Sequence, residues 1–288
     1  MMLAAKNPHP RDERVRFVDE THTYYIDGSS DGYLSCTTFI HGLFGKFDAD
    51  AIITKMMKSP KFAIGDYAGM TREEIKAKWD KNRDEAAAAG TAMHLNLEMY
   101  YNDEPHVENT KEWDLFCSYQ KDFPDYKAYR TEMIVFAEDL KIAGSIDMVY
   151  HDPEEPGSYI ICDWKRSKEI KMNNRFQKGC SALTRDLDDC NLVHYSLQLN
   201  LYKYILHNYY DMKVNAIFLC VLHPNQDTYL KIEGLDLYDR IEALMRERRA
   251  KIERSHGVTP PPNKKPRVEV GDGAEDDANK ENIPPSNM

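Results

Sequence analysis

Two short apolar runs in the middle of the chain are separated by residues that form turns. The first run covers Ile146 to Tyr150 and the second Tyr159 to Cys162. Both are rich in β-branched and aromatic residues, which are typical of strands. Residues 152–157, with the sequence Asp-Pro-Glu-Glu-Pro-Gly, indicate a turn. The pattern therefore predicts a β-hairpin.

This hairpin carries two carboxylates and an ammonium group. Asp147 lies early on the first strand and Asp163 at the end of the second. Strands paired in the register that the turn allows bring the two carboxylates to neighbouring points on one sheet edge. Lys165 follows Asp163 by two residues and therefore projects to the same face. Such a group offers hard oxygen ligands to Mg²⁺ and places an ammonium beside a water or a phosphate oxygen.

The rest of the hydrophobic pattern predicts helices and strands around this hairpin. Residues 23–26 and 32–36 are expected to form an N-terminal hairpin, and further strands are expected at 129–137, 142–144 and 214–221. Helices are expected to start at 35–38 and to cover 48–57, 71–79, 82–101, 113–126, 188–208 and 235–255. Together these elements predict an α/β fold, with a central mixed β-sheet flanked by helices and an N-terminal helical addition.

Length and composition favour one folded domain with a tail. The chain has 288 residues and 42% hydrophobic content, enough for one sizeable core. We expect a flexible N-terminus at 1–14 and a single domain at 15–258, in which about 48–90 form the helical addition. Residues 259–288 contain prolines and almost no aromatic residues, so a disordered tail is expected. Its Lys264-Lys-Pro-Arg267 run resembles a nuclear localisation signal or is a random basic patch. The expected location is intracellular and nuclear.

Charge and cysteine content narrow the class of function. The net charge of −10 argues mildly against nucleic-acid binding. Residues 163–185, however, hold seven basic and two acidic residues, a local balance of +5. The six cysteines have no zinc-ligand spacing, which favours a reduced intracellular protein. The sequence has no apolar run near 18 residues, so no membrane span is expected.

Four motifs occur in an order that resembles a known nuclease family. Upstream of the hairpin is Gly90-Thr-Ala-Met-His94-Leu-Asn-Leu-Glu98, the hairpin itself holds Gly144-Ser-Ile-Asp147 and Asp163-Trp-Lys165, and downstream is Gln198-Leu-Asn-Leu-Tyr202. This set resembles the RecB-type exonuclease branch of the PD-(D/E)xK nuclease superfamily. The layout is similar to mitochondrial genome maintenance exonucleases and their viral relatives. The resemblance covers about residues 15–250.

The resemblance implies a metal-dependent DNA exonuclease that acts in DNA replication, repair or recombination. The implied metal ligands, which would bind Mg²⁺ or Mn²⁺, are His94, Glu98, Asp147 and Asp163. The implied catalytic residues are Asp147, Asp163, Lys165, Gln198 and Tyr202. The spacing of His94 and Glu98 places both on one helix face. Some relatives hold an iron–sulfur cluster on four cysteines, three of them clustered after the nuclease motifs. Only Cys220 follows Tyr202 here, so no iron–sulfur cluster is expected.

Further residues are candidates for DNA contacts. The basic residues that follow the second strand of the hairpin would hold phosphates; they are Arg166, Lys168, Lys171 and Arg175. The hydroxyl groups of Ser35, Thr37 and Thr38 either bind a phosphate or simply cap a helix. Trp79 either stacks on a base or packs in the core.

The substrate and the mode of cleavage leave alternatives open. The helical segment from Asp48 to Trp79 precedes the His94 helix, where the resemblance implies an arch over a channel. Single-stranded DNA with free ends is therefore the expected partner, and no membrane is involved. One alternative is a structure-specific endonuclease with the same site. The other is a catalytically silent DNA-binding or recombination scaffold, which the intact carboxylate and lysine set argues against.

Overall fold

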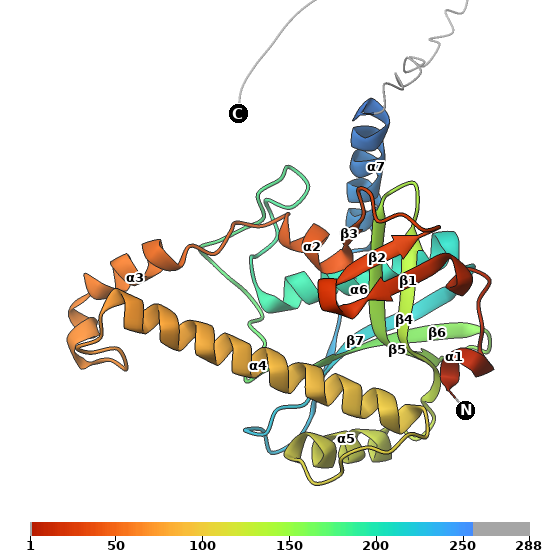
Figure 1. Ribbon diagram of the computed structural model, residues 1–288, viewed down its shortest axis with the longest axis horizontal. Coiled ribbons are helices and arrows are strands. Elements are labelled where there is room, and N and C mark those ends of the chain that lie inside the picture. Colours follow the sequence, from red (N-terminus) through yellow and green to blue (C-terminus); the bar gives the residue numbers. More distant parts are fainter. Residues whose placement is uncertain (1, 256–288) are drawn as a thin grey trace, which may run out of the picture.

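The computed structural model describes residues 2–255 (Figure 1). A central sheet lies between two groups of helices, and one long helix extends away from it. The expected disordered tail and its basic run, at 259–288, lie outside the described residues. In the described part, no helix has both the length and the apolar character that crossing a membrane requires.

The sheet is mixed, as the sequence predicts. Its strands follow the order β3-β5-β6-β7-β8, and β4 also pairs with β5. The β3–β5 and β6–β7 pairs are parallel, and the others are antiparallel. The strands are β3 (Leu34–Ser35), β4 (Lys127–Ala137), β5 (Ile142–His151), β6 (Ser158–Lys165), β7 (Lys213–Val221) and β8 (Leu230–Glu233). The α/β fold with a central mixed sheet flanked by helices is thus confirmed.

The two faces of the sheet have separate hydrophobic cores. One core joins the sheet to α2 (Cys36–His41), α6 (Asn191–Tyr209) and α7 (Tyr238–Ser255). The other joins it to the C-terminal part of α4 (Arg72–Tyr101) and to α5 (Lys111–Asp122). Alternate residues of β5 and β6 enter the second core because successive strand side chains point to opposite faces.

The strand β5 has a gap along one of its edges. β4 pairs with β5 over most of its length, whereas the opposite edge pairs first with β3, at Ile142, and later with β6, at Met148. Gly144 lies between these two pairings. A Cβ atom there would lie 2.8 Å from Tyr202 Cε1 and 2.9 Å from Cys36 Sγ. The glycine is therefore required so that α6 and α2 can approach the sheet beside Asp147.

The arm formed by α3 (Ala49–Met57), the short 3₁₀ helix η3 (Pro60–Ile64) and the N-terminal half of α4 projects from the sheet (Figure 1). The expected helices at 71–79 and 82–101 are one helix, which corrects the prediction. Residues 80 and 81 are Asp and Lys, which do not break a helix as proline or glycine would. Thr71 and Glu74 form the expected capping box.

The N-terminal strands pair differently from the prediction. β2 (Thr23–Ile26) forms a hairpin with β1 (Val15–Val18), joined by η2 (Asp19–Thr21), and not with residues 32–36. Leu34 instead donates its backbone N–H to Lys141 O, which adds β3 to the central sheet. The turns at Gly28 and Gly32, both with positive φ, redirect the chain.

The first residues, for which the sequence predicts a flexible segment, are packed against the core. This segment contains α1 (Leu3–Lys6) and η1 (Asp12–Arg14). Leu3 is buried and donates its N–H to Asn102 Oδ1 at 2.7 Å. Asp12 forms an ion pair with the buried Arg130 at 2.8 Å. These contacts tie the N-terminus to α4 and β4.

Gly144→Ala is expected to destabilise the protein by about 1–3 kcal/mol, because the added methyl group overpacks a closed site. Chemical denaturation measures the loss. Gly90→Ala is the control, since a Cβ atom there meets no atom within 4 Å and should raise helix stability by about 0.5–1 kcal/mol. Equal stability of Gly144→Ala and the wild type would contradict the close packing described here.

Candidate active site

Three side chains that could hold a metal ion converge above the sheet. His94 comes from α4, Glu132 from β4 and Asp147 from β5. One ligand atom from each lies within 4.8 Å of the others. His94 Nδ1 is 3.5 Å from Asp147 Oδ2 and 4.0 Å from Glu132 Oε1. An imidazole with two carboxylates is a donor set that suits a divalent cation.

Asp147 is held in place by β6, the strand that the sequence analysis predicts to pair with its own strand. Its Oδ2 accepts a hydrogen bond from Trp164 N at 2.8 Å. Regular pairing of β5 with β6 includes Met148 opposite Cys162. This pairing ends at Cys162, so the backbone N–H of Trp164 binds the Asp147 side chain and not strand β5. The prediction that Asp147 and the end of the second strand are neighbours is confirmed.

Glu132 is a site residue that the sequence analysis missed. Thr131 pairs with Met148 and Met133 with Ile146, so Glu132 lies opposite Asp147 across the β4–β5 ladder. Its φ of 43° is in the left-handed region, which is rare for a residue in a strand. Its Oε2 accepts a hydrogen bond from Ser145 Oγ at 2.7 Å. Facing carboxylates and a strained backbone both cost stability, and such features cluster at functional sites.

Asp163 and Lys165 form a second, more buried part of the site. Asp163 is 2% exposed, and its Oδ2 lies 2.5 Å from Lys165 Nζ. The Lys165 ammonium also lies 4.8 Å from the centre of the Tyr195 ring. The prediction that Lys165 and Asp163 project to the same face is confirmed. A buried carboxylate therefore aims a half-buried ammonium group.

Gln198 and Tyr202 lie next to this pair, on one face of α6. Gln198 Nε2 donates to Asp163 Oδ1 at 3.4 Å and to Tyr202 Oη at 3.2 Å. Tyr202 is buried, and it is the ring that fills the gap at Gly144. The structure thus brings the third and fourth motifs together. One glutamine amide thus links Asp163 of β6 to Tyr202 of α6.

The protonation states follow from burial and from the neighbouring charges. Burial and Asp147 raise the pKa of Glu132 to about 8. Burial also raises the pKa of Asp163 to about 6, although Lys165 opposes this shift. Burial by itself would lower the pKa of Lys165, but Asp163 and Asp147 raise it above its ordinary value. Lys165 therefore stays protonated at neutral pH, while the carboxylates resist carrying their full negative charge together.

The residues present fit a divalent cation. His94, Glu132 and Asp147 supply one nitrogen and several oxygen atoms, and the carboxylates are too crowded to be ionised together without a compensating charge. Glu98, which the sequence predicts as a ligand, is not in this group. It lies one turn beyond His94 on α4 and lines the cavity beside it, where burial raises its pKa.

The predicted DNA-contacting residues are spread over several parts of the surface. Arg166 is engaged by Glu112 at 2.7 Å. Lys168, Lys171 and Arg175 are exposed on the irregular segment between β6 and α6. The hydroxyl groups at the start of α2 bond to one another, and Ser35 Oγ accepts from Thr38 N at 3.0 Å; these groups belong to Ser35, Thr37 and Thr38. Trp79 lies on the arm and donates its indole N–H to Tyr67 Oη at 2.9 Å.

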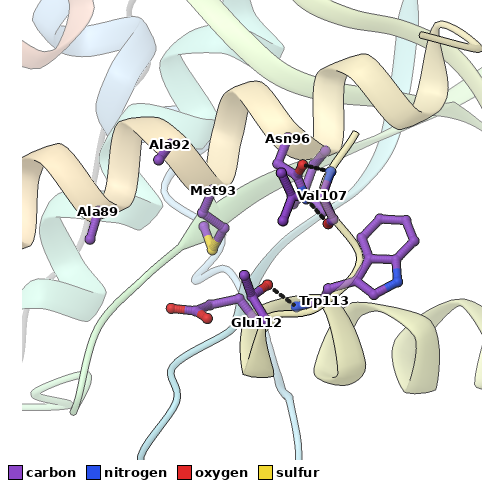
Figure 2. A pocket seen from close by; sticks show the side chains of 9 residues that line it. Ala89, Ala92, Met93, Asn96, Val107, Glu112 and Trp113 are labelled. Atoms are coloured by element: carbon purple, nitrogen blue, oxygen red, sulfur yellow. Dashed lines mark hydrogen bonds between the residues drawn. The ribbon is translucent and has the colours of Figure 1, made fainter. Parts of the chain in front are cut away.

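Two cavities lie on opposite faces of α4. One, of about 560 Å³, is lined by His94 and Glu132 and so adjoins the candidate metal site. The other, of about 280 Å³, lies between α4 and α5 and is mostly apolar (Figure 2). Its wall includes Asn96, whose side-chain amide forms two hydrogen bonds with the backbone of Val107. The carboxylate that lines this second cavity belongs to Glu112, and it forms an ion pair with Arg166. The second cavity therefore lacks a cluster of ligand groups like the one beside the first.

Comparisons with known proteins add little to this geometry. No protein-family model and no curated protein sequence matches the chain. The crystal structure of SSO0001 is similar with a TM-score of 0.33 and 11% identity, over 78% of each chain. A "putative exonuclease" from Eubacterium rectale is similar with a TM-score of 0.32 and 13% identity, over 75% of this chain and 71% of that one. Similarity this low carries no argument, so the function is inferred from the site residues.

Glu132→Gln is expected to stabilise the metal-free protein at about pH 8.5 and to have a smaller effect near pH 5. The pKa of Glu132 is about 8 in the folded protein, against roughly 4.3 in an unfolded chain. Between these values the folded state binds more protons, so wild-type stability falls as pH rises, and the uncharged glutamine removes that loss. Thermal unfolding with a chelator measures the difference.

Two further observations complete this test. Glu253→Gln, an exposed glutamate on α7, controls for the loss of one negative charge. Added Mg²⁺ or Mn²⁺ should raise the melting temperature of the wild type more than that of Glu132→Gln, because a ligand that binds the folded state stabilises it. A Glu132→Gln curve parallel to that of the wild type at every pH would contradict the role of Glu132.

Proposed function

We propose that this protein is a metal-dependent nuclease that hydrolyses phosphodiester bonds in DNA. The supporting observation is the approach of His94, Glu132 and Asp147 within 4.8 Å beside the ion pair of the buried Asp163 with Lys165. During hydrolysis of a phosphodiester, negative charge builds on the phosphate oxygens. A cation bound by hard ligands and a nearby fixed ammonium group would both stabilise that charge. The motif order, which resembles RecB-type nucleases, supports the same reaction.

The metal site would be formed by His94, Glu132 and Asp147, with Asp163 next to it. Mg²⁺ or Mn²⁺ suits these ligands. When bound, the cation would lower the pKa of a water ligand and neutralise charge on the phosphate. The backbone N–H of Trp164 keeps Asp147 pointing into the site, and Ser145 does the same for Glu132.

Lys165 acts as a cationic hydrogen-bond donor in this mechanism. Its raised pKa keeps it protonated, so it stabilises charge on the phosphate or orients the attacking water and does not abstract a proton. Asp163 fixes the ammonium through the 2.5 Å contact. Gln198 in turn donates to the other oxygen of Asp163. The chain of contacts from α6 to β6 thus positions one ammonium group, which is how enzymes preorganise charge for a transition state.

The substrate in this proposal is single-stranded DNA with a free end, as needed in DNA replication, repair or recombination. The arm built from α3 and the N-terminal half of α4 projects from the sheet (Figure 1), and Ile53 and Ile75 give it a small buried core of its own. The exposed residues Lys168, Lys171 and Arg175 are placed on the segment that follows the catalytic strand. They would bind phosphates away from the cleaved bond.

Asp163→Asn should abolish metal-dependent cleavage of DNA while the fold is kept, because the amide has the same shape but no charge. Lys165→Ala should retain cation binding and lose about 10²–10³-fold in rate, the usual effect of removing one transition-state donor. Cleavage is followed on end-labelled single strands with Mg²⁺, and cation binding by calorimetry. Asp125→Asn, an exposed carboxylate, is the control. Near wild-type cleavage by Asp163→Asn would refute the site.

Circular single-stranded DNA should resist the enzyme, whereas the same molecule cut once should be degraded. In this proposal the arm closes over the bound strand and admits DNA only from an end, so a covalently closed circle cannot enter. Both substrates are incubated with Mg²⁺ and resolved on a denaturing gel. Efficient cutting of the circle would instead identify a structure-specific endonuclease with the same site.

A further inference from the structure

A cavity of about 560 Å³ lies between the β1–β2 hairpin and α4, directly beside the candidate metal site. Its size is in the range of small-molecule sites, about 300–1,000 Å³. Glu132, Ile134 and Ser145 line it from the sheet. One of these, Glu132, also belongs to the metal-binding group. Whatever occupies this cavity therefore touches the reaction centre.

Aromatic rings of the N-terminal hairpin form one wall. Phe17 and His22 both line the cavity, and their rings meet edge to face with centroids 5.1 Å apart. Phe17 is also supported by the buried Tyr24, at 4.6 Å. His22 has a φ of 48°, a left-handed backbone that costs about 1–3 kcal/mol where a side chain other than glycine adopts it. The hairpin thus presents a ring surface that is held rigidly.

The opposite wall is the part of α4 that contains Gly90. This glycine follows four alanines, Ala86 to Ala89, in the interior of the helix, where it costs about 0.5–1 kcal/mol relative to alanine. A Cβ atom at Gly90 would meet no atom within 4 Å, so no contact within the described chain requires glycine. Gly90 nevertheless lines the cavity. A glycine with open space in front of it suits close approach by a molecule from outside the chain.

The charge of the cavity indicates which part of a substrate fits. Three of its side chains are carboxylates, Asp19, Glu98 and Glu132. These three side chains offer no positive charge to a phosphate that enters the cavity itself. An uncharged, flat group that stacks on a ring is favoured instead, because every nucleobase has a π-face and stacks on aromatic side chains.

We propose that this cavity holds the nucleobase of the nucleotide next to the scissile phosphate, an inference that rests on the proposed nuclease function. The base stacks on the Phe17 ring, with His22 at its edge, and its outer side lies against the helix at Gly90. The sugar then leads to the phosphate at the metal site. The N-terminal hairpin is in this way part of substrate recognition, and it requires a base at one defined position of the strand.

The test compares intact oligonucleotides with oligonucleotides that lack one base. A single abasic site is placed at successive positions of an otherwise identical single strand, and the rate at each bond is measured with Mg²⁺. Wild-type cleavage should slow by about five- to a hundredfold at one position only, the usual worth of one stacked base. Phe17→Leu, which keeps apolar bulk without the ring, should bring the intact-to-abasic ratio close to one.

Gly90→Leu gives an independent test, since it fills the cavity from the helix side and should also bring the ratio close to one. Ala92→Leu is its matched control, because Ala92 lies on the same helix but lines the cavity on the other face (Figure 2). It should keep the wild-type ratio. If Phe17→Leu fails to fold, as judged by circular dichroism, Gly90→Leu decides. A wild type without the abasic effect, or a Gly90→Leu variant that keeps it, overturns the inference.

A binding measurement separates this inference from the nuclease proposal. The affinities of the same intact and abasic strands are measured by fluorescence anisotropy with Ca²⁺ in place of Mg²⁺. If the wild type cleaves no DNA but binds the intact strand more tightly than one abasic strand, and Gly90→Leu does not, the cavity assignment stands and the nuclease proposal fails. If the wild type cleaves DNA but binds and cleaves all strands equally well, the nuclease proposal stands and the cavity assignment fails.

Discussion

Repulsion among carboxylates is the constraint on which the rest of this structure depends. Glu132 and Asp147 face each other across adjacent strands, and Asp163 is buried on the next strand. Burial and, after it, the nearby Asp147 raise the pKa of Glu132 to about 8, because buried carboxylates this close cannot all ionise at low cost. Lys165 offsets part of this charge. A cation held by the remaining oxygens and His94 would offset the rest, so a bound cation would stabilise the folded protein.

The gap along β5 explains how these groups can meet. A continuous strand pairing beside residues 144–147 would use the backbone N–H of Trp164, which now binds Asp147, and it would exclude the Tyr202 ring of α6 from the sheet. β6 joins β5 only from Met148 onward, so Trp164 N is available to Asp147 Oδ2. The bare backbone of Gly144 admits the Tyr202 ring. The same opening therefore orients a carboxylate and brings in the glutamine that steadies Asp163.

Much of this arrangement can be predicted from local sequence, and its limits have physical causes. The Asp147 and Asp163 strands are recognisable because a Pro/Gly turn joins two β-branched runs. Glu132 gave no such sign, since its role comes from register and from a left-handed φ. The register could have been predicted only from the turn between Ala137 and Ile142, which pair with each other. Counting back along both strands from that pair places Glu132 opposite Asp147. Arg166 pairs with Glu112, 54 residues away, and a contact at that separation leaves no local pattern.

Residues 23–26 were predicted to form a hairpin with residues 32–36, whereas in the structure they pair with β1. Residues 34–35 instead join the central sheet as β3. As a separate two-stranded unit, the β1–β2 hairpin stands over α4 and closes one side of the cavity beside His94. Two-stranded hairpins have little stability of their own, so this one depends on its packing through Tyr24 and Ile26 into the core. Its partly exposed rings are thus fixed from behind and remain open to a ligand in front, which is the arrangement that stacking on a base requires.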